Sequence, residues 1–460
     1  MGGNRLSDAP PGLTLDRLAT LVASHDIDTV VVGITDMQGR LQGKRFAAAH
    51  FLEEVVTRGT EGCSYLLAVD VDMNTVPGYA MASWELGYGD FVMAPDLSTI
   101  RLLPWHPGTA FCVADAEWAD RTPVVASPRQ VLQHQSERLA AHGWHALAAT
   151  ELEFIVFNDT FEHAWQTGYR NLTPANLYNV DYSLLGTGRV EPLLRRIRNE
   201  MGGAGMWVES AKGECNLGQH EIAFRYTGLV TKADEHSLFK TGAKEIAAQE
   251  GCSLTFMAKY DAREGSSCHI HISLRDDSDQ PVFSGDKGHG FSKVFEQFIA
   301  GLLASLRELT LLVAPNVNSY KRFAPGLFAP TAVAWGRDNR SCALRVVGHE
   351  PSSLRVECRV PGGDVNPYLA LAAIVAGGLY GIEEGLELEP EFVGNAYDSD
   401  KPRLPTTLRE AADLFATSPV AREAFGAEVV DHYTNMARVE LDAFDSAVTD
   451  WERYRGFERL

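Results

Sequence analysis

Six side chains of the types that bind hard metal ions are spread over the chain from residue 151 onwards. Oxygen-rich ligand sets suit Mg²⁺ or Mn²⁺, and in enzymes these ions commonly accompany phosphates. The set therefore indicates metal-assisted ATP chemistry. Its members are Glu151 and Glu153 in A-T-E-L-E-F, Glu214 and Glu221 in E-C-N-L-G-Q-H-E, His269 in S-C-H-I-H-I-S, and Glu357 in R-V-E-C-R-V.

The sequence around these residues has the alternation of β-strands. Residues two apart on a strand share a face, so Glu151 and Glu153 point to one side and Leu152 to the other. An ordinary solvated face is the simpler alternative, but such a face would be richer in lysine, threonine and serine. We therefore expect a sheet whose apolar face meets helices and whose polar face lines a cleft. Two further segments repeat the pattern, with polar faces made by His269, His271 and Ser273 and by Arg355, Glu357 and Arg359.

Arginines gather around turns in the same half of the chain. The guanidinium group binds carboxylate and phosphate in a bidentate manner, although any single arginine here could equally form a surface ion pair. Neither G-x-x-x-x-G-K-[ST] nor a good G-x-G-x-x-G occurs, which argues against a P-loop or Rossmann nucleotide site. Carboxylates for metals and arginines for anionic oxygens suit a site that joins ATP to a carboxylic acid. The arginines are Arg322, Arg337, Arg340 and Arg345.

The elements that must position these residues form two units of unequal size. Residues 14–115 alternate short apolar runs with Gly and Pro turns, which is typical of a small α+β unit. A polar boundary near 115–127 precedes a helix that Ser127 and Pro128 begin and Gly143 ends. The larger part is predicted to be α+β around an antiparallel sheet. Its expected elements are strands over 147–157, 254–259, 269–274 and 345–360, helices over 234–249 and 369–382, and an amphipathic helix over the last 30 residues or so.

Composition limits the partners and the compartment. The net charge of −20 argues against binding to a nucleic-acid backbone, which needs a basic surface. Seven scattered cysteines with no C-x-x-C pair favour a reducing cytoplasm over a disulfide framework or a zinc site. No apolar leader begins the chain, and its most apolar stretch is too short to span a bilayer. We expect a cytoplasmic protein without nucleic-acid or membrane partners.

Seven short motifs, taken in order, resemble the glutamine synthetase superfamily, type I, from about residue 14 to the C-terminus. The resemblance implies an N-terminal β-grasp domain over 14–115 and a larger catalytic domain over 120–460. It also implies a dodecamer of two hexameric rings with active sites between subunits, using ATP, L-glutamate and two or three Mg²⁺ or Mn²⁺ ions. The motifs are E-L-E-F at 151–154, G-Q-H-E at 218–221, S-S-C-H-I-H-I-S-L at 266–274, N-S-Y-K-R-F-A-P-G at 318–326, R-D-N-R-S at 337–341, R-V-E-C-R at 355–359 and N-P-Y-L-A-L-A-A at 366–373.

The resemblance also implies a role for each candidate residue. Phosphorylation turns the glutamate γ-carboxylate into an acyl phosphate, while metals and arginines offset the charge on the transferring group. An amine then attacks as the neutral base, after an anionic pocket has attracted its ammonium form. One metal would be held by Glu153, Glu214 and Glu221, and the other by Glu151, His269 and Glu357. Glutamate would be held by Arg322, Arg359 and the Gly265 backbone, and the nucleotide by His271, Ser273 and Tyr226. Phosphates would be held by Arg340, Arg345 and Arg355, with Arg340 as the strongest candidate for stabilising the transferring phosphoryl group.

Two departures from the family pattern concern the amine. Where ammonia-using relatives present Asp-Gly-Ser-Ser to the neighbouring subunit, this chain has T-E-G-C-S, in which Glu61 keeps the charge one methylene further out. Where the flap over glutamate usually carries Glu, this chain has Phe328. Asp90 still matches an ammonium-site carboxylate, and the tyrosine that joins it is either Tyr178 or Tyr182.

Phe328 cannot accept a proton, but it can pack against carbon atoms. We therefore predict ATP-dependent ligation of glutamate to a primary alkylamine, giving a γ-glutamylamide, with ethanolamine and short polyamines as leading candidates. An ammonia-using glutamine synthetase is the main alternative, and a catalytically silent structural or regulatory relative is the alternative of another class. Tyr397 lies where adenylylated relatives carry their modified tyrosine, but its flanks match poorly, and we interpret it as a surface tyrosine.

Overall fold

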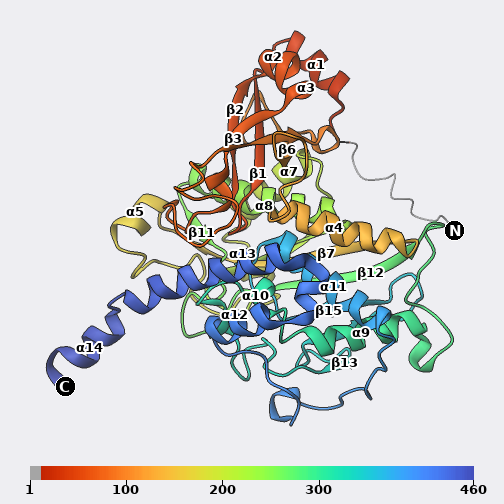
Figure 1. Ribbon diagram of the computed structural model, residues 1–460. Coiled ribbons are helices and arrows are strands. Elements are labelled where there is room, and N and C mark those ends of the chain that lie inside the picture. Colours follow the sequence, from red (N-terminus) through yellow and green to blue (C-terminus); the bar gives the residue numbers. More distant parts are fainter. Residues whose placement is uncertain (1–11) are drawn as a thin grey trace.

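The structure, a computed structural model, describes residues 12–460 and contains two β-sheets in parts of unequal size (Figure 1). The smaller sheet is built from N-terminal residues and lies at the top of the view, above the larger part. The predicted α+β fold is confirmed. Among residues 12–460, no helix has the length and apolar character needed to cross a membrane.

The smaller sheet has the strand order β2-β1-β6-β4-β3, with β5 paired to β6. β1 and β6 run parallel and the other neighbours antiparallel. Its own core includes Val30, Val32, Phe51 and Phe91. The elements are α1 (Leu15–Ala23), β1 (Thr29–Thr35), β2 (Leu41–Ala47), α2 (Ala48–His50), η2 (Phe51–Val55), α3 (Val56–Arg58), β3 (Thr60–Cys63), η3 (Ser64–Leu67), β4 (Asp90–Pro95), η4 (Leu97–Thr99), β5 (Arg101–Leu102) and β6 (Thr109–Glu117).

The larger sheet has the order β13-β14-β15-β12-β7-β9-β8, with β10 and β11 also paired to β7. All neighbours are antiparallel except β13 and β14, which run parallel, so the sheet is mixed where a purely antiparallel one was expected. The strands are β7 (Trp144–Phe157), β8 (Val208–Gly213), β9 (Gln219–Phe224), β10 (Thr227–Gly228), β11 (Ser253–Thr255), β12 (Cys268–Asp276), β13 (Trp335–Arg337), β14 (Leu344–Val347) and β15 (Arg355–Cys358).

Helices pack on the apolar face of this sheet, as the alternation predicted. Leu152 and Phe154 of β7 and Ile270 and Ile272 of β12 are buried in the main core. Helices α4 and α8 contact β7, and α11 packs across α4, α8 and α9. The helices are α4 (Pro128–Ala141), α5 (Phe161–Gln166), α6 (Leu184–Thr187), α7 (Glu191–Gly203), α8 (Leu229–Gln249), η5 (Gly288–Gly290), α9 (Lys293–Ser305), α10 (Thr310–Val313), η6 (Ser319–Arg322), α11 (Pro367–Glu383), η7 (Ala396–Asp398), α12 (Leu408–Thr417), α13 (Pro419–Ser446) and α14 (Asp450–Arg459).

Two predicted strands are shorter or divided. The stretch 345–360 forms β14 and β15, joined by a turn in which Gly348 has a φ of +98° and lies so close to Ser353 that a Cβ would meet its carbonyl oxygen at 2.2 Å. The stretch 254–259 is paired only as far as Thr255, because the Thr255 side chain then accepts a hydrogen bond from the backbone of Met257 and turns the chain.

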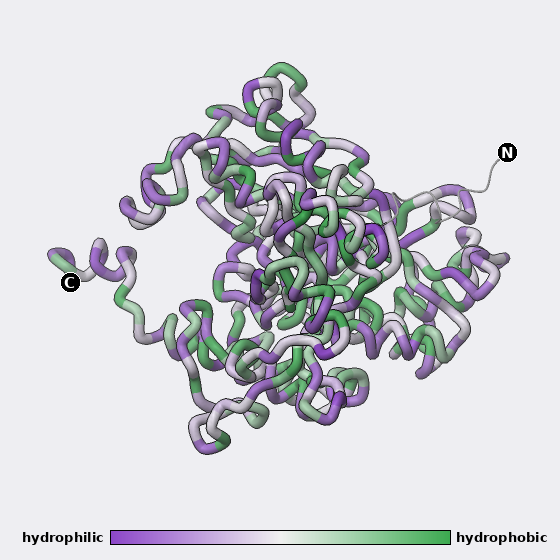
Figure 2. Tube along the Cα trace, turned by 90° about the horizontal axis from the view of Figure 1, so that it is seen from above, coloured by the Kyte–Doolittle hydropathy of each residue, from purple (hydrophilic) through white to green (hydrophobic). Residues whose placement is uncertain are grey.

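The C-terminal stretch is two helices instead of one amphipathic helix. The break at 447–449 is followed by Thr449, whose side chain and that of Glu452 form a capping box that begins α14. Helix α14 has no buried residue and extends from the body of the molecule (Figures 1 and 2). In Figure 2 the hydrophobic segments gather toward the middle, away from this arm.

A buried arginine joins the two parts. Arg129 at the start of α4 donates to Asp234 of α8 at 3.0 Å, to Asp115 of β6 at 2.6 Å, and to Asp96 at 2.7 Å. Tyr368 of α11 also donates to Asp234, at 2.6 Å. The carboxylates of the smaller part are thus held against helices of the larger part by one shared cation.

We predict that Arg129→Met lowers the free energy of unfolding by about 3–5 kcal/mol, because it leaves Asp234 buried without its partner. Chemical denaturation measures the change. The matched control is Arg138→Met, whose partly exposed ion pair with Glu383 is worth about 0–1 kcal/mol. Equal effects of the two substitutions would contradict the assignment of Arg129 as the joining residue.

Candidate active site

Three rows of charged side chains cross the polar face of the larger sheet. Residues directly opposite each other on neighbouring strands share a face, so the strand register brings together residues that lie far apart in the sequence. The register pairs Glu153 with Glu221 and Glu221 with Lys212 in one row, His269 with Glu151 in the next, and His271 with Glu357 and Glu357 with Arg345 in the third.

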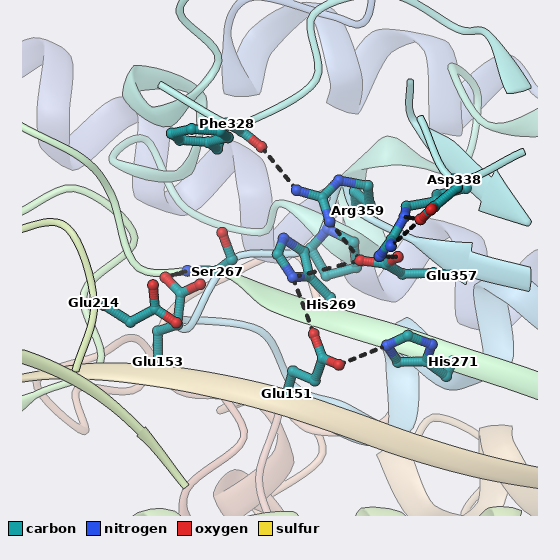
Figure 3. A network of polar contacts seen from close by, with 12 residues as sticks. Glu151, Glu153, Glu214, Ser267, His269, His271, Phe328, Asp338, Glu357 and Arg359 are labelled. Atoms are coloured by element: carbon teal, nitrogen blue, oxygen red, sulfur yellow. Dashed lines mark hydrogen bonds and ion pairs between the residues drawn. The ribbon is translucent and has the colours of Figure 1, made fainter. Parts of the chain in front are cut away.

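The six predicted ligands fall into the two predicted groups. Glu151, His269 and Glu357, the histidine group, each offer one ligand atom, and these atoms lie within 4.8 Å of one another. The carboxylate group consists of Glu153, Glu214 and Glu221 and meets the same limit. Figure 3 shows Glu153 and Glu214 of the carboxylate group beside the histidine group, with Glu151 and Glu153 both rising from β7. The structure therefore assembles every ligand that the sequence proposed.

The histidine group combines a neutral imidazole with two carboxylates that the protein keeps ionised. His269 Nδ1 lies 3.3 Å from Glu151 Oε2 and 3.6 Å from Glu357 Oε1. Burial lowers the pKa of His269 to about 4, so its ring is neutral and can act as a metal ligand. Burial would raise the pKa of Glu357, but His269 and the Arg359 guanidinium outweigh it and hold this pKa at about 2.

The second carboxylate of this group is fixed by His271. Its Nε2 lies 2.9 Å from Glu151 Oε1, while its Nδ1 accepts a hydrogen bond from Arg355 Nε at 3.2 Å. Burial opposes ionisation of Glu151, but the bonds to His269 and His271 lower its pKa well below the usual range. His271 thus orients a ligand from behind, as partners of metal-binding residues commonly do.

The carboxylate group is crowded and lacks comparable cations. Burial, and then the charge of Glu214, raise the pKa of Glu153 to about 8. Burial and the surrounding carboxylates also raise the pKa of Glu221 well above its ordinary value. Glu153 is nevertheless oriented, because Gln219 Nε2 and the Ser267 backbone N–H donate to its Oε2 at 2.9 and 2.7 Å. The group is arranged to receive a cation.

Lys212 is a site residue that the sequence reasoning missed. It lies on edge strand β8 directly opposite Glu221, and its Nζ contacts Glu214 Oε1. Burial would lower its pKa, but Glu214 and Glu221 outweigh that effect and raise it. A usable signal was present: in S-A-K-G-E the lysine stands two residues before Glu214, the spacing that puts strand residues on one face.

Two of the predicted arginines meet at Glu357. Arg359 donates from Nη1 to Glu357 Oε1 at 2.5 Å and from Nη2 to the Phe328 carbonyl at 3.3 Å. Arg345 donates from Nη1 to Glu357 Oε2 at 2.9 Å and pairs with Asp338 as well. Arg359 Nε is buried without a partner, so this side chain retains a donor for a ligand.

Arg322 and Gly265 lie in contact beneath the site. Both terminal nitrogens of Arg322 are used: Nη1 donates to the Val360 carbonyl at 2.7 Å, and Nη2 to the Arg359 carbonyl at 2.9 Å. Only its Nε has no partner. A Cβ at position 265 would meet Arg322 Cγ at 2.7 Å and the Ala258 carbonyl oxygen at 2.3 Å. Glycine is therefore required for this close packing.

A cavity of about 1010 Å³ opens beside the histidine group. Glu151 stands in its lining, together with four residues predicted to serve the nucleotide or its phosphates. Two aromatic residues at its wall, Trp207 and Tyr226, carry the Arg225 guanidinium over their rings at 4.8 and 5.7 Å. The four predicted residues are Tyr226, His271, Ser273 and Arg355. Arg340 is exposed in the turn after β13, and the described residues give its side chain no hydrogen bond or ion pair.

Phe328 lies in the turn after η6, with a φ of +57° and 56 % of its surface exposed. Its carbonyl oxygen accepts from Arg359, and in Figure 3 its ring lies on the same side of the network as Glu214. Tyr182 lies close to the carboxylate group, since the centre of its ring is 4.9 Å from Lys212 Nζ. The sequence alone did not decide between Tyr178 and Tyr182. Tyr178 is exposed and has no such contact among residues 12–460.

Glu61 and Asp90 lie in the smaller sheet. Both are exposed, on the antiparallel pair β3 and β4, where Cys63 is opposite Asp90. Lys44 Nζ donates to the Glu61 carbonyl oxygen at 2.5 Å. Within the described part of one chain, no hydrogen bond or ion pair connects either carboxylate with the six ligands, so their predicted role stays a prediction.

Tyr397 is less exposed than an ordinary surface tyrosine. Its hydroxyl is buried and has no hydrogen-bond partner. Burial raises its pKa, although the charges of Arg359 and Arg322 act in the opposite direction. The hydroxyl therefore faces the interior on the side of these arginines, which corrects the surface interpretation.

Comparisons with known proteins agree with this arrangement. Residues 125–455 match the family described as glutamine synthetase, catalytic domain. The chain is 66% identical over 455 residues to γ-glutamylethanolamide synthetase GlnA4 of Streptomyces coelicolor, covering 99% of this chain and 98% of that protein. It is 36% identical over 445 residues to glutamate–isopropylamine ligase of a Pseudomonas species, covering 95% and 97%.

A solved structure described as a GmaS/ADP complex superposes with a TM-score of 0.84 at 26% sequence identity, over 96% of this chain and 99% of that one. The family match and the relatives span most of the chain, and the chain therefore belongs to the glutamine synthetase family. The family predicted from the seven motifs is confirmed.

We predict that divalent cations stabilise the protein more at pH 8 than at pH 6. Without metal, Glu153 binds a proton up to about pH 8 in the folded chain, and the unfolded chain releases it near the ordinary value. Stability without metal therefore falls as pH rises through this range, and a cation that replaces the proton restores it.

Melting temperatures with Mn²⁺ and with a chelator, at both pH values, measure the effect. In Glu221→Gln, which removes one of the crowded charges, the difference between pH values should shrink. A metal-induced increase at pH 6 equal to or larger than that at pH 8 would contradict the assignment.

Proposed function

We propose that this chain is an ATP-dependent ligase that joins the γ-carboxylate of L-glutamate to a primary amine, with ethanolamine as the amine. The observation that carries the proposal is the pairing of the two ligand groups on one sheet face with Arg345 and Arg359. The 66% identity to a γ-glutamylethanolamide synthetase supports the choice of amine. The reaction proceeds through a γ-glutamyl phosphate and yields ADP, phosphate and a γ-glutamylamide.

The donor sets fit hard divalent cations. The histidine group offers a neutral imidazole and two ionised carboxylates, and the carboxylate group offers three carboxylates of which two are buried. Mg²⁺ or Mn²⁺ held there would offset the charge of the phosphates during transfer. The chain itself orients the ligands through His271, Gln219 and the Ser267 backbone.

Glutamate and the nucleotide approach from different sides of the sheet face. Arg359, with an unused Nε and a bond to the flap carbonyl, binds the glutamate carboxylate, and the fixed Arg322 shapes the pocket with Gly265. The nucleotide occupies the cavity beside Glu151, whose wall has the aromatic residues Trp207 and Tyr226 for a base. Arg355 lines this cavity and Arg345 donates to Glu357, so both are placed to bind the phosphates of the nucleotide. Arg340 faces the phosphoryl group during its transfer.

The amine enters between the carboxylate group and the flap. Glu214 attracts its ammonium form, the Tyr182 ring offers a face to the cation, and Phe328 contacts its carbon atoms. Ammonia has no carbon atoms to use this contact. The apolar flap and the similarity to two amine ligases favour the amine over ammonia as the substrate. The intact ligand set argues against a catalytically silent relative.

The functional unit is a homo-oligomer, a dodecamer of two hexameric rings in which Glu61 and Asp90 face the neighbouring subunit's amine pocket. The exposure of both residues supports this arrangement, as does the lack of any hydrogen bond or ion pair between their carboxylates and the six ligands within the described part of one chain. The aromatic residues Trp451, Tyr454 and Phe457 on the protruding α14 offer a surface for a second copy. The compartment is the cytoplasm.

The test is phosphate release with ATP, Mg²⁺ and L-glutamate against ammonium, ethanolamine, isopropylamine, putrescine and spermidine, with each product identified by mass. We expect the highest kcat/KM with ethanolamine. A value for ammonium equal to or above that of every amine would make ammonia the substrate. No phosphate release with any of them would leave only the silent relative.

We predict that Phe328→Glu shifts the ratio of kcat/KM for ammonium to that for ethanolamine upward by about tenfold, the effect of one added carboxylate–ammonium contact of ~1.4 kcal/mol. Leu327→Glu, on the preceding residue, is the matched control and should leave the ratio unchanged. An unchanged ratio in Phe328→Glu would remove Phe328 from the amine pocket.

A further inference from the structure

Lys212 places a positive charge at the proposed entrance for a positively charged substrate. Its Nζ contacts Glu214 and lies 4.9 Å from the centre of the Tyr182 ring. A carboxylate and an aromatic face are the two features that recognise an ammonium group. The Lys212 ammonium therefore occupies a position that has the features needed to bind the ammonium group of an amine.

The lysine side chain is not confined to this position. It belongs to β8, the edge strand of the sheet, and 27% of the side chain is exposed. A divalent ion bound by the carboxylate group would repel Nζ from Glu214. Since Glu221 lies opposite Lys212 on the inner side, the open direction for Nζ is toward Tyr182 and the solvent.

A further carboxylate belongs to the same surroundings. Ligand atoms of Asp181, Glu214 and Cys215 lie within 4.8 Å of one another, and Asp181 precedes Tyr182 in an exposed turn. Asp181 and Glu214 therefore present two negative charges to an arriving amine, and Lys212 presents one positive charge beside them.

A diamine brings a second positive charge into the region where the Lys212 ammonium lies beside Glu214 and Tyr182. Repulsion between these like charges is unfavourable in a partly buried region. A monoamine has no second charge and avoids this repulsion.

We infer that Lys212 determines which amines this enzyme accepts: its ammonium repels amines with a second positive charge and donates a hydrogen bond to a hydroxyl at the far end of the substrate. The inference rests on the proposed ligase function and deepens it. It favours amino alcohols over diamines of the same length, which separates ethanolamine from the short polyamines that the sequence left open beside it.

The first measurement uses the wild-type enzyme and length-matched substrates. The kcat/KM values for 3-aminopropan-1-ol and 1,3-diaminopropane are compared by glutamate-dependent phosphate release, with ethanolamine as the reference. We expect the amino alcohol to be favoured by about tenfold or more, the size of one repulsion between unit charges at the protein surface. No turnover with any amine would overturn the proposed function; equal turnover of the matched pair would overturn the inference about Lys212 alone.

The second measurement changes the charge. Lys212→Met keeps most of the side-chain length and removes the charge, so the preference for the amino alcohol should fall about tenfold, chiefly through improved use of the diamine. Lys212→Arg should retain the preference. Lys293→Met, an exposed lysine on α9 outside the site and without an ion pair among the described residues, should behave as wild type.

The pattern of kcat/KM changes across the three substrates shows whether Lys212 selects among amines or supports activity in general. If Lys212→Met lowered kcat/KM for ammonium, the amino alcohol and the diamine by the same factor, Lys212 would serve the carboxylate group and the inference would be wrong. The wild-type comparison of the matched pair tests the inference even if the Met variant does not fold.

Discussion

Repulsion between carboxylates is the constraint on which the rest of the site depends. Five glutamates converge on one face of a single sheet, and three of them are buried. Buried like charges cannot all be ionised unless cations lie among them. Each cation near this face, whether an arginine, a lysine or a bound metal, therefore follows from how these five groups are neutralised.

The protein answers this constraint differently in the two halves of the site. Around Glu357 it supplies its own cations, Arg345 and Arg359, so this half keeps its charge without a ligand. Around Glu153 and Glu221 the charges of Arg322 and Lys212 do not outweigh burial and the neighbouring carboxylates, and protons take the remaining place. The half around Glu357 therefore has its charges balanced in the free protein, whereas the half around Glu153 and Glu221 becomes fully ionised only when a cation binds. The responsive half is the one that lies beside Tyr182.

Much of this arrangement could be predicted from the sequence because strand alternation is a local rule. The spacing of Glu151 and Glu153, and of His269 and His271, is enough to predict their common faces. The alternation also separates the apolar residues that meet α4 and α8. Lys212 was missed because a lysine among glutamates is most simply a solvated ion pair, and only the register with Glu221 reveals its place. The division of 345–360 depends on the close approach at Gly348, which no periodicity encodes.

The positions of Glu61, Asp90 and α14 show the limit of such rules. All three are exposed within one chain, and neither alternation nor composition says whether another surface covers them. The same holds for the amine, since the apolar Phe328 proposed for its pocket says nothing about how many charges the substrate carries.

Strand β7 has a consequence for how the protein matures. It supplies one glutamate to each ligand group, and its neighbours in the sheet come from residues 219–276. The partners of Glu151 and Glu153 are thus separated from them by between about 60 and 206 residues of chain. Such long-range pairings form late, because the loops between them must close first. A nascent or partly folded chain therefore has neither ligand group assembled. The chain can use ATP only after the sheet is complete.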